Sequence, residues 1–144
     1  MTPTPGSAIS YSQRDRPGLS PATAEVSSAL VLRYFDMWNT GQGATADELL
    51  GPNYIEHAHP DFLGPAALRS LVPRLHAMFP GVVVRAEVVA SDPEYVAVRT
   101  HIEPGDADGH PSAPRNGVAL FRIADGKLAE QWSWYAPVRA GRSA

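Results

Sequence analysis

Cysteine and lysine are the residue types that this sequence most clearly lacks. Its 144 residues contain no cysteine and a single lysine, Lys127. Without cysteine there are no disulfides, no thiolate zinc sites and no cysteine nucleophile, which fits a reducing cytoplasm. Lys127 lies beside a predicted turn that solvent reaches, so Schiff-base chemistry, which needs a desolvated lysine, is not expected.

The sequence also lacks a basic stripe and a long apolar run. The net charge is -3 and the pI is about 5.9, and the basic residues are scattered along the chain. Nucleic-acid binding is therefore not expected. No apolar stretch approaches the roughly 20 residues that span a bilayer, and the N-terminus lacks the basic-then-apolar order of a secretory signal. We therefore expect a cytoplasmic protein with no membrane contact.

Length and composition predict one globular domain. With 44% hydrophobic residues, the chain can bury a single core. Residues 1–19 are rich in Pro, Ser, Thr and Gly and show little periodicity, which predicts a flexible N-terminal tail. The predicted domain covers residues 20–138, and residues 139–144 form a C-terminal tail.

Helical patterns fill the first half of the chain. Ser20 is a predicted N-cap, and apolar residues from Val26 to Trp38 then recur at helical spacing up to a stop at Thr40. Thr45 and Glu48 fit a capping box for a short second helix. A third helix is predicted from Gly64 to about Pro80, with Pro73 expected to kink or split it.

Strand patterns fill the second half. Four long strands are predicted there, at residues 82–90, 95–103, 117–124 and 127–135. A further short strand is predicted earlier, at residues 53–58, between the second and third helices. Asp125-Gly126 between the last two is a strong hairpin signal. Helices followed by antiparallel strands predict an α+β domain, in which the helices cover one face of a bent sheet.

The Asp-Gly turn also predicts which side chains of the last hairpin share a face. If Ala124 pairs with Lys127, strict alternation gives one face of eight residues: Gly117, Ala119, Phe121, Ile123, Leu128, Glu130, Trp132 and Trp134. Tryptophans opposite glycine and alanine predict a concave, aromatic-lined pocket. In the inverted register, Gln131 and Ser133 line the pocket and Glu130 is solvated.

Five segments together resemble a known family, the SnoaL-like polyketide cyclases of the nuclear-transport-factor-2-like superfamily. They are RYFDMWN (33–39), NYIEH (53–57), MFPG (78–81), YVAVRTH (95–101) and ALFRIADGKLAEQW (119–132). The resemblance implies a cone-shaped, curved antiparallel sheet covered by N-terminal helices, also described as a cystatin-like barrel. It further implies a deep pocket between sheet and helices, homodimers, and acid–base chemistry without a cofactor on polyketide-like or other apolar molecules.

The sequence departs from this family at two places that matter for chemistry. Family members often carry an aspartate, their general acid or base, where this chain has Ala119. They often read EHWD where this chain reads EQWS at residues 130–133. The resemblance therefore carries the fold over more directly than the activity.

Three residues are predicted as catalytic, because acid–base work at neutral pH needs a histidine or a desolvated carboxylate. His101 shares a strand face with Arg99 and Glu103, and this row could orient a carbonyl and move a proton; the alternative is an exposed or dimer-facing row of ion pairs. His57 ends the first predicted strand. Glu130 either lies near the open end of the cone or is a buried acid with a raised pKa, and in the inverted register it is solvated.

The predicted substrate-binding residues are mostly aromatic: Tyr34, Trp38, Tyr54, His59, Arg99, Phe121, Trp132 and Trp134. Aromatic walls suit planar or polycyclic ligands, although each ring alone is better explained as ordinary core. His57 and His59 could bind a metal together, but no third ligand is evident, so no metal site is predicted.

Two functions remain open on the sequence alone. The first is a cofactor-independent cyclase, isomerase, dehydratase or epoxide hydrolase that acts on an apolar, polyketide-type substrate. The second is a non-catalytic ligand-binding or assembly protein on the same fold, which the alanine at position 119 favours. In either case we expect an apolar or polycyclic small molecule as ligand and a homodimer formed through the sheet.

Overall fold

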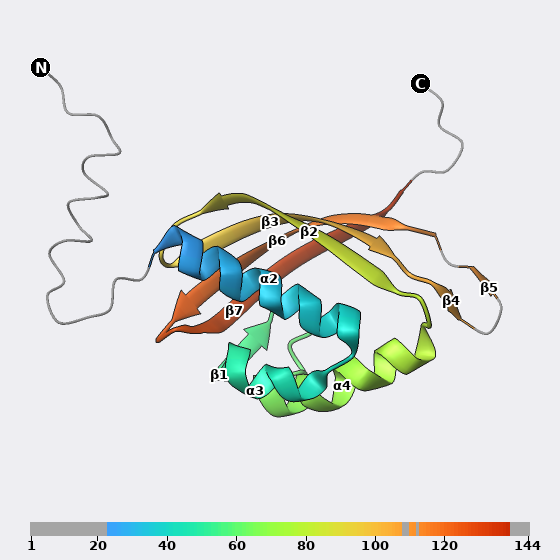
Figure 1. Ribbon diagram of the computed structural model, residues 1–144, viewed down its shortest axis with the longest axis horizontal. Helices are drawn as coiled ribbons and strands as arrows, with labels where there is room; N and C mark the ends of the chain where they lie inside the picture. The colour runs from blue at the N-terminus through green and yellow to red at the C-terminus, as the bar shows by residue number, and fades with distance from the viewer. Residues whose placement is uncertain (1–22, 108–109, 112, 139–144) are drawn as a thin grey trace, which may run out of the picture.

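Four helical segments lie N-terminal to most of the sheet. The computed structural model describes residues 23–107, 110–111 and 113–138 (Figure 1), so the predicted tails at residues 1–19 and 139–144 lie outside the described residues. The segments are α2 (Ala24–Thr40), the 3₁₀ turn η1 (Gly43–Thr45), α3 (Ala46–Leu49) and α4 (Gly64–Met78).

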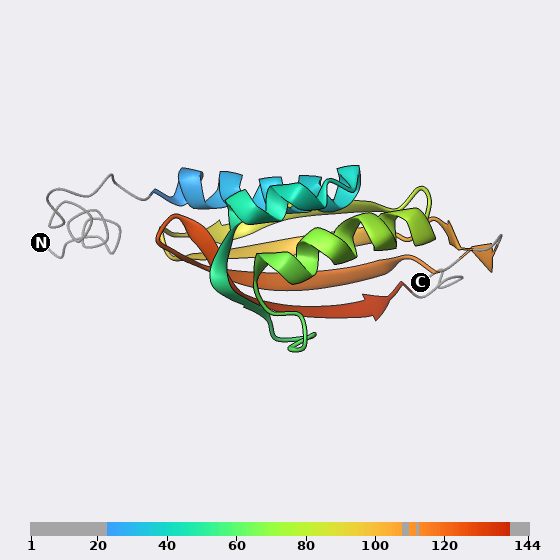
Figure 2. The same ribbon diagram turned by 90° about the horizontal axis from the view of Figure 1, so that it is seen from below.

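Five strands form one mixed, curved sheet with the order β1-β7-β6-β3-β2. They are β1 (Leu50–Glu56), β2 (Val83–Ser91), β3 (Tyr95–Glu103), β6 (Arg115–Ala124) and β7 (Lys127–Pro137). β1 pairs with β7 in parallel, and the other neighbours are antiparallel. The predicted loop before β6 contains a two-stranded ribbon, β4 (Asp106–Ala107) and β5 (His110–Pro111). Figure 2 shows α2 and α4 on one side of the sheet, which confirms the predicted layers.

α2 begins and ends at identifiable caps. The Thr23 hydroxyl accepts a hydrogen bond from Val26 N, and Gly41 adopts the left-handed conformation at the C-terminus. The predicted stop is confirmed, whereas the observed N-cap is Thr23 rather than Ser20, which lies outside the described residues. Val26 was predicted in the apolar stripe but is 60% exposed, because the buried face begins at Ser27.

The capping-box prediction for the second helix is wrong, and one of the two effects expected at Pro73, the split, is absent. Thr45 makes no capping hydrogen bond, and Glu48 pairs instead with Arg33 of α2 at 2.9 Å. Pro73 does not split α4, which is continuous through it. Proline deprives the Arg69 carbonyl of its helical donor. That carbonyl packs against Gly43, where any side chain would collide with it.

The β6–β7 hairpin has the predicted turn but not the predicted alternation. Ala124 pairs with Lys127 and Ile123 with Leu128, but Arg122 pairs with Glu130. Ala129 is therefore an extra residue in β7, that is, a β-bulge. Since strand side chains alternate with period two, one extra residue moves every later side chain of β7 to the other face.

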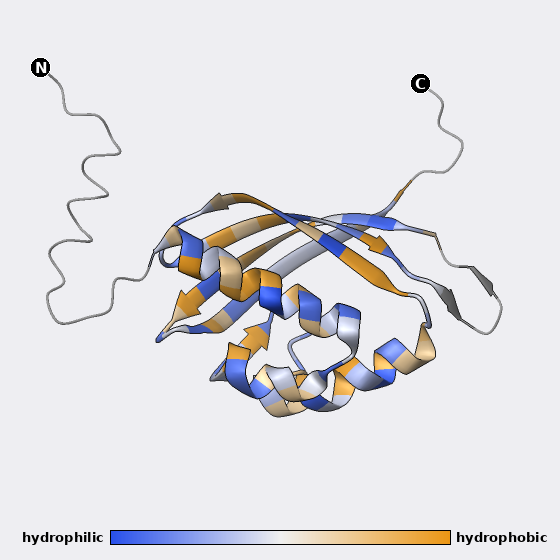
Figure 3. Ribbon diagram, viewed as in Figure 1, coloured by the Kyte–Doolittle hydropathy of each residue, from blue (hydrophilic) through white to orange (hydrophobic). Residues whose placement is uncertain are grey.

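The core lies between the helices and the inner face of the sheet, defined here as the helix-covered face. Phe121 of β6 is fully buried and makes edge-on contacts with Tyr34 and Phe35 of α2, with ring centroids 5.2 and 5.7 Å apart. Each such pair stabilises the fold by about 0.5–1.5 kcal/mol beyond the stabilisation that comes from burying its apolar area. Asn39 joins α2 to β2, because its amide bonds both N and O of Val84. Figure 3 shows apolar and polar residues alternating along the strands, as a sheet with one covered face requires.

Candidate functional site

A polar network lies on the inner face where β1 meets β7. The Tyr54 hydroxyl donates to Gln131 Oε1 at 2.5 Å, and Ser133 Oγ donates to Glu56 Oε2 at 2.9 Å. The backbone N–H of Ala58 donates to Glu56 Oε1, also at 2.9 Å. The inner network, defined as Tyr54, Glu56, Gln131 and Ser133, is thus built from alternate residues of two adjacent strands.

Glu56 is the chemically distinctive member of this network. Among the described residues, it is the only charged side chain in the buried set, with 9% of its surface exposed. Its two oxygens each accept one hydrogen bond, and none of the described cations forms an ion pair with it. A buried carboxylate held only by neutral donors is a candidate acid or base.

Two buried tyrosines next to Glu56 stay protonated. Burial raises the pKa of Tyr54 well above its ordinary value. Burial also raises the pKa of Tyr34, and hydrogen bonding to Tyr54 and Trp38 offsets part of that rise. Neutral phenols donate hydrogen bonds, so this part of the inner face offers donors rather than a second negative charge.

At the C-terminal end of β7, the inner-face residue next to the network is partly exposed to solvent. Tyr135 lies on the inner face opposite Gly117, yet 39% of its surface is exposed. Partial burial and, secondarily, the charge of Glu56 raise the pKa of Tyr135. Beside its ring, Thr100 Oγ1 is buried and has no hydrogen-bond partner within the described part of the chain. An unsatisfied buried hydroxyl is costly, and a ligand oxygen there would satisfy it.

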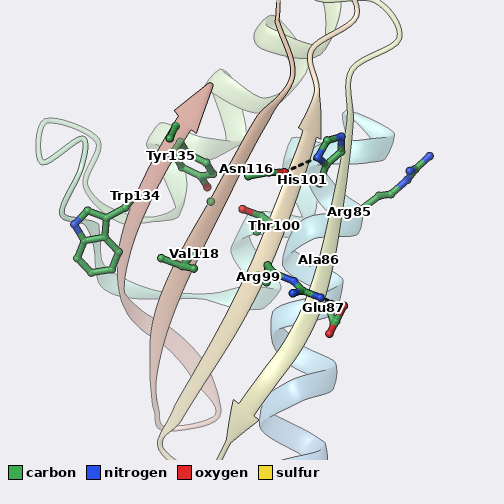
Figure 4. Close-up of a pocket in the computed structure, with 12 residues that line it drawn as sticks. Arg85, Ala86, Glu87, Arg99, Thr100, His101, Asn116, Val118, Trp134 and Tyr135 are labelled. Atoms are coloured by element: carbon green, nitrogen blue, oxygen red, sulfur yellow. Dashed lines mark hydrogen bonds and ion pairs between the residues drawn. The ribbon is translucent and has the colours of Figure 1, made fainter. Parts of the chain in front are cut away.

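The outer face of the sheet carries a shallow groove across four strands (Figure 4). It holds about 910 Å³. The residues that line it include Arg85, Glu87, Arg99 and His101 of β2 and β3, Asn116, Val118 and Trp134 of β6 and β7, and also Thr100 and Tyr135. Arg99 pairs with Glu87 at 2.9 Å. This arrangement fits the exposed row of ion pairs that the sequence left open as an alternative.

His101 lies in this outer groove and is held from both sides. Its Nδ1 is 2.7 Å from Asn116 Oδ1, and its Nε2 is 2.7 Å from Glu103 Oε1. Both partners are acceptors, so both ring nitrogens donate, which is the pattern of a protonated imidazole. The hydrogen bonds to Asn116 and Glu103 raise the pKa of His101.

A second outer-face cluster surrounds Glu130. Its carboxylate accepts from Arg122 Nε at 2.7 Å and lies 2.8 Å from His57 Nε2. These two hydrogen bonds lower the pKa of Glu130, so the prediction of a buried acid with a raised pKa is wrong. The His57 ring stacks on Trp132, with centroids 4.8 Å apart and planes 9° apart.

The structure divides the sequence-predicted site residues between the two faces. Tyr34, Trp38, Tyr54 and Phe121 lie on the inner side, and Trp38 keeps part of its surface exposed. The outer face carries His57, Arg99, His101, Glu130, Trp132 and Trp134. His59 lies in the exposed turn after β1, edge-on to Phe62. Of the three predicted catalytic residues, His57 and Glu130 are in contact, whereas His101 lies apart from them in the outer groove, and their roles stay predictions.

The prediction that both tryptophans face the pocket is wrong. Trp132 and Trp134 pair with Leu120 and Val118 on the outer face, and Trp134 is 60% exposed. Gln131 and Ser133 face inward instead, as the inverted register predicted. The cause is the bulge at Ala129, because it shifts the alternation by one residue.

Sequence reasoning missed Glu56 as a site residue. The signal was present, because period-two alternation places residue 56 on the same face as Tyr54. The sequence instead predicts His57 as the catalytic residue at the end of this strand, whereas the buried side chains are those of Tyr54 and Glu56.

Metal binding and membrane spanning find no support in the described residues. Within residues 23–107, 110–111 and 113–138, no three His, Cys, Asp or Glu side chains come together in a group that could hold a metal ion. None of the described helices is long and apolar enough to cross a bilayer.

Comparison with known proteins agrees with this architecture. The family model of the SnoaL-like domain matches residues 31–131, which includes most of the helical layer and the β1–β7 junction. The chain belongs to the SnoaL-like domain family. No curated protein matches the sequence.

Several solved structures share the SnoaL-like fold. A SnoaL-like polyketide cyclase from Agrobacterium tumefaciens is 19% identical, with 74% of this chain and 88% of that chain covered and a TM-score of 0.61. An uncharacterized cystatin-fold protein from Novosphingobium aromaticivorans is 20% identical, with 77% and 96% covered and a TM-score of 0.64. TsrD from Streptomyces laurentii is 18% identical, with 77% and 88% covered and a TM-score of 0.63. At these identities the likeness establishes the fold.

Proposed function

We propose that this SnoaL-like protein is a cofactor-independent acid–base enzyme that acts on an apolar, polyketide-type carbonyl compound. The observation that carries the proposal is the buried Glu56 carboxylate, which has no cationic partner among the described residues and lies beside tyrosine hydroxyls. Membership of the SnoaL-like family and the likeness to the polyketide cyclase from Agrobacterium tumefaciens support the reaction class.

In the proposed mechanism Glu56 is the general base. Its carboxylate removes a proton from the carbon next to a substrate carbonyl, and the electron pair of that C–H bond moves onto the carbonyl oxygen. Hydroxyl donors stabilise the resulting enolate, and Tyr135 and Thr100 are the nearest candidates at the solvent-reached end. The enolate carbon then attacks a second carbonyl, and the proton on Glu56 returns to the new alkoxide.

Hydrogen–deuterium exchange tests the first step without knowledge of the natural substrate. Exchange at the carbon next to the carbonyl of α-tetralone, a bicyclic aryl ketone, is followed by NMR in D₂O. We expect wild-type protein to accelerate this exchange, with no effect of EDTA, and Glu56→Gln to reduce the acceleration by roughly 10²–10⁴-fold. Glu48→Gln is the matched control, because that carboxylate is exposed on α3 and pairs with Arg33, away from the inner network. Equal rates for wild type and Glu56→Gln would contradict the proposal.

Exposed apolar side chains on the outer face favour a second role, assembly with a second copy of the chain. Val118 and Trp134 pair across β6 and β7 and are 50% and 60% exposed. Side-by-side exposed apolar groups on a sheet are typical of an interface. Sedimentation velocity tests this role: Trp134→Ser is expected to weaken a dimer, whereas Leu63→Ser, at an equally exposed residue outside the sheet, is not.

A ligand-binding protein without catalysis is distinguished by the same measurements. Thermal stabilisation by α-tetralone without accelerated exchange would favour that alternative, which the alanine at position 119 also favours.

A further inference from the structure

The C-terminal end of β1 is held to β7 by few backbone contacts. Only three residue pairs define the parallel ladder, Leu50–Leu128, Ile55–Glu130 and Glu56–Gln131, and the register shifts between the first two. One further hydrogen bond runs from His57 N to Gln131 O at 2.8 Å. Side-chain contacts must therefore help to hold the end of β1, where the inner network lies, in position against β7.

On the outer face, His57 makes the contacts that attach the end of β1 to β7. His57 is held by three successive residues of β7: its Nε2 meets the Glu130 carboxylate, its backbone N–H meets Gln131 O, and its ring stacks on Trp132. Arg122 fixes the other oxygen of Glu130 at 2.7 Å, which sets the direction of the carboxylate. These contacts hold the His57 ring against β7, although 39% of its side chain remains exposed.

On the inner face, the neighbouring residue depends on the same turn. The chain reverses directly after His57, with His59 N donating to Glu56 O at 2.9 Å. Within that turn the N–H of Ala58 points to Glu56 Oε1. If His57 moves, the peptide that follows it moves, and Glu56 loses one of the two donors that orient its carboxylate.

We propose that His57 is a positioning residue for Glu56. From the outer face it anchors the turn that delivers the Ala58 N–H to Glu56 Oε1, and so fixes the carboxylate on the opposite face. Successive strand residues point to opposite faces, so His57 on the outer face can fix the backbone that orients Glu56 on the inner face. The consequence for turnover rests on the proposed function, but the positioning itself does not.

NMR of the Ala58 amide tests the positioning directly. In His57→Ala we expect the hydrogen-exchange protection of this amide to fall by about ten-fold or more, and its hydrogen-bonded proton shift to move upfield. His57→Phe retains a ring for Trp132 but not the bond to Glu130, so an intermediate loss is expected. His59→Ala is the matched control, because its ring contacts Phe62 rather than the sheet.

The outcomes separate the positioning from the proposed function. Unchanged Ala58 protection in both His57 variants, each shown to be folded by the dispersion of its other amide signals, would overturn the inference. Reduced protection supports it, and α-tetralone exchange should then slow through kcat with little change in KM. If Glu56→Gln leaves exchange catalysis intact while the Ala58 amide responds to His57, the proposed function fails and the positioning stands.

Discussion

The buried hydrogen bond between Tyr54 and Gln131 offers a sharp test of the β7 register. The donor and acceptor atoms are 2.5 Å apart, and the two residues are 1% and 2% exposed. We predict that Tyr54→Phe destabilises the protein by about 1–3 kcal/mol, because it leaves the Gln131 carbonyl oxygen buried without its donor. In the register expected from strict alternation, Gln131 would face solvent and Tyr54→Phe would not affect it.

A double-mutant cycle gives the magnitude that belongs to the pair. Gln131→Leu alone removes the acceptor to which the Tyr54 hydroxyl donates, and we expect a similar cost. The double variant removes both polar groups and leaves two apolar side chains of similar size, so it should cost less than the sum of the single changes. We expect a coupling free energy of about 1 kcal/mol or more.

Urea denaturation followed by circular dichroism at one protein concentration measures the four free energies of unfolding. The slope m should stay constant, so that shifts in midpoint report stability. Tyr95→Phe is the control, because Tyr95 is on the outer face with 36% of its surface exposed, and a change within about 0.5 kcal/mol is expected. Additive single effects, with no coupling between Tyr54 and Gln131, would refute the observed register.

Three further predictions concern pH and packing. The folded-state pKa of Tyr34 is raised, so its contribution to the free energy of unfolding is complete below the unfolded pKa of about 10 and is lost above it, by about 1.4 kcal/mol per pH unit. Tyr34→Phe should therefore reduce the fall in the free energy of unfolding with rising alkaline pH, measured by urea denaturation. The pKa of His101 should lie above its ordinary value in an NMR titration and fall in Glu103→Gln, and the contribution of its imidazolium contacts should disappear as pH rises through that raised pKa. Gly117→Ala should destabilise the protein by about 1–3 kcal/mol in thermal unfolding, because a Cβ there would collide with the ring and backbone of β7; an unchanged melting temperature would contradict the close packing at this position.

Much of the fold is predictable because its signals are local. The Asp125-Gly126 turn fixes the last hairpin through backbone conformations at positive φ, which these two residues adopt. Gly41 ends α2 for the same reason. Pro73 shows the limit of local rules, because α4 continues through it once the freed Arg69 carbonyl packs against Gly43 from another part of the chain.

The face of each residue after the bulge is not predictable from local pattern. Nothing about Ala129 marks it as an extra residue, and both registers give a plausible alternation of apolar and polar groups. The choice depends on contacts distant in sequence: Tyr54 provides a donor for Gln131, and Glu56 provides an acceptor for Ser133. Without β1, Trp132 and Trp134 would be the more favourable residues to bury.

This bulge also accounts for where the candidate chemistry lies. On the inner face Ser133 pairs with Ala119 of β6, and its hydroxyl donates to Glu56 of β1. The carboxylate thus lies on the other side of β7 from position 119, at which the family resemblance implies an aspartate, and Ser133 of β7 bridges the two positions. In the unbulged register a tryptophan would stand between them, and neither Gln131 nor Ser133 could reach β1. The loss of a carboxylate on β6 is therefore compatible with acid–base chemistry only because one extra residue in β7 turns its polar side chains toward Glu56.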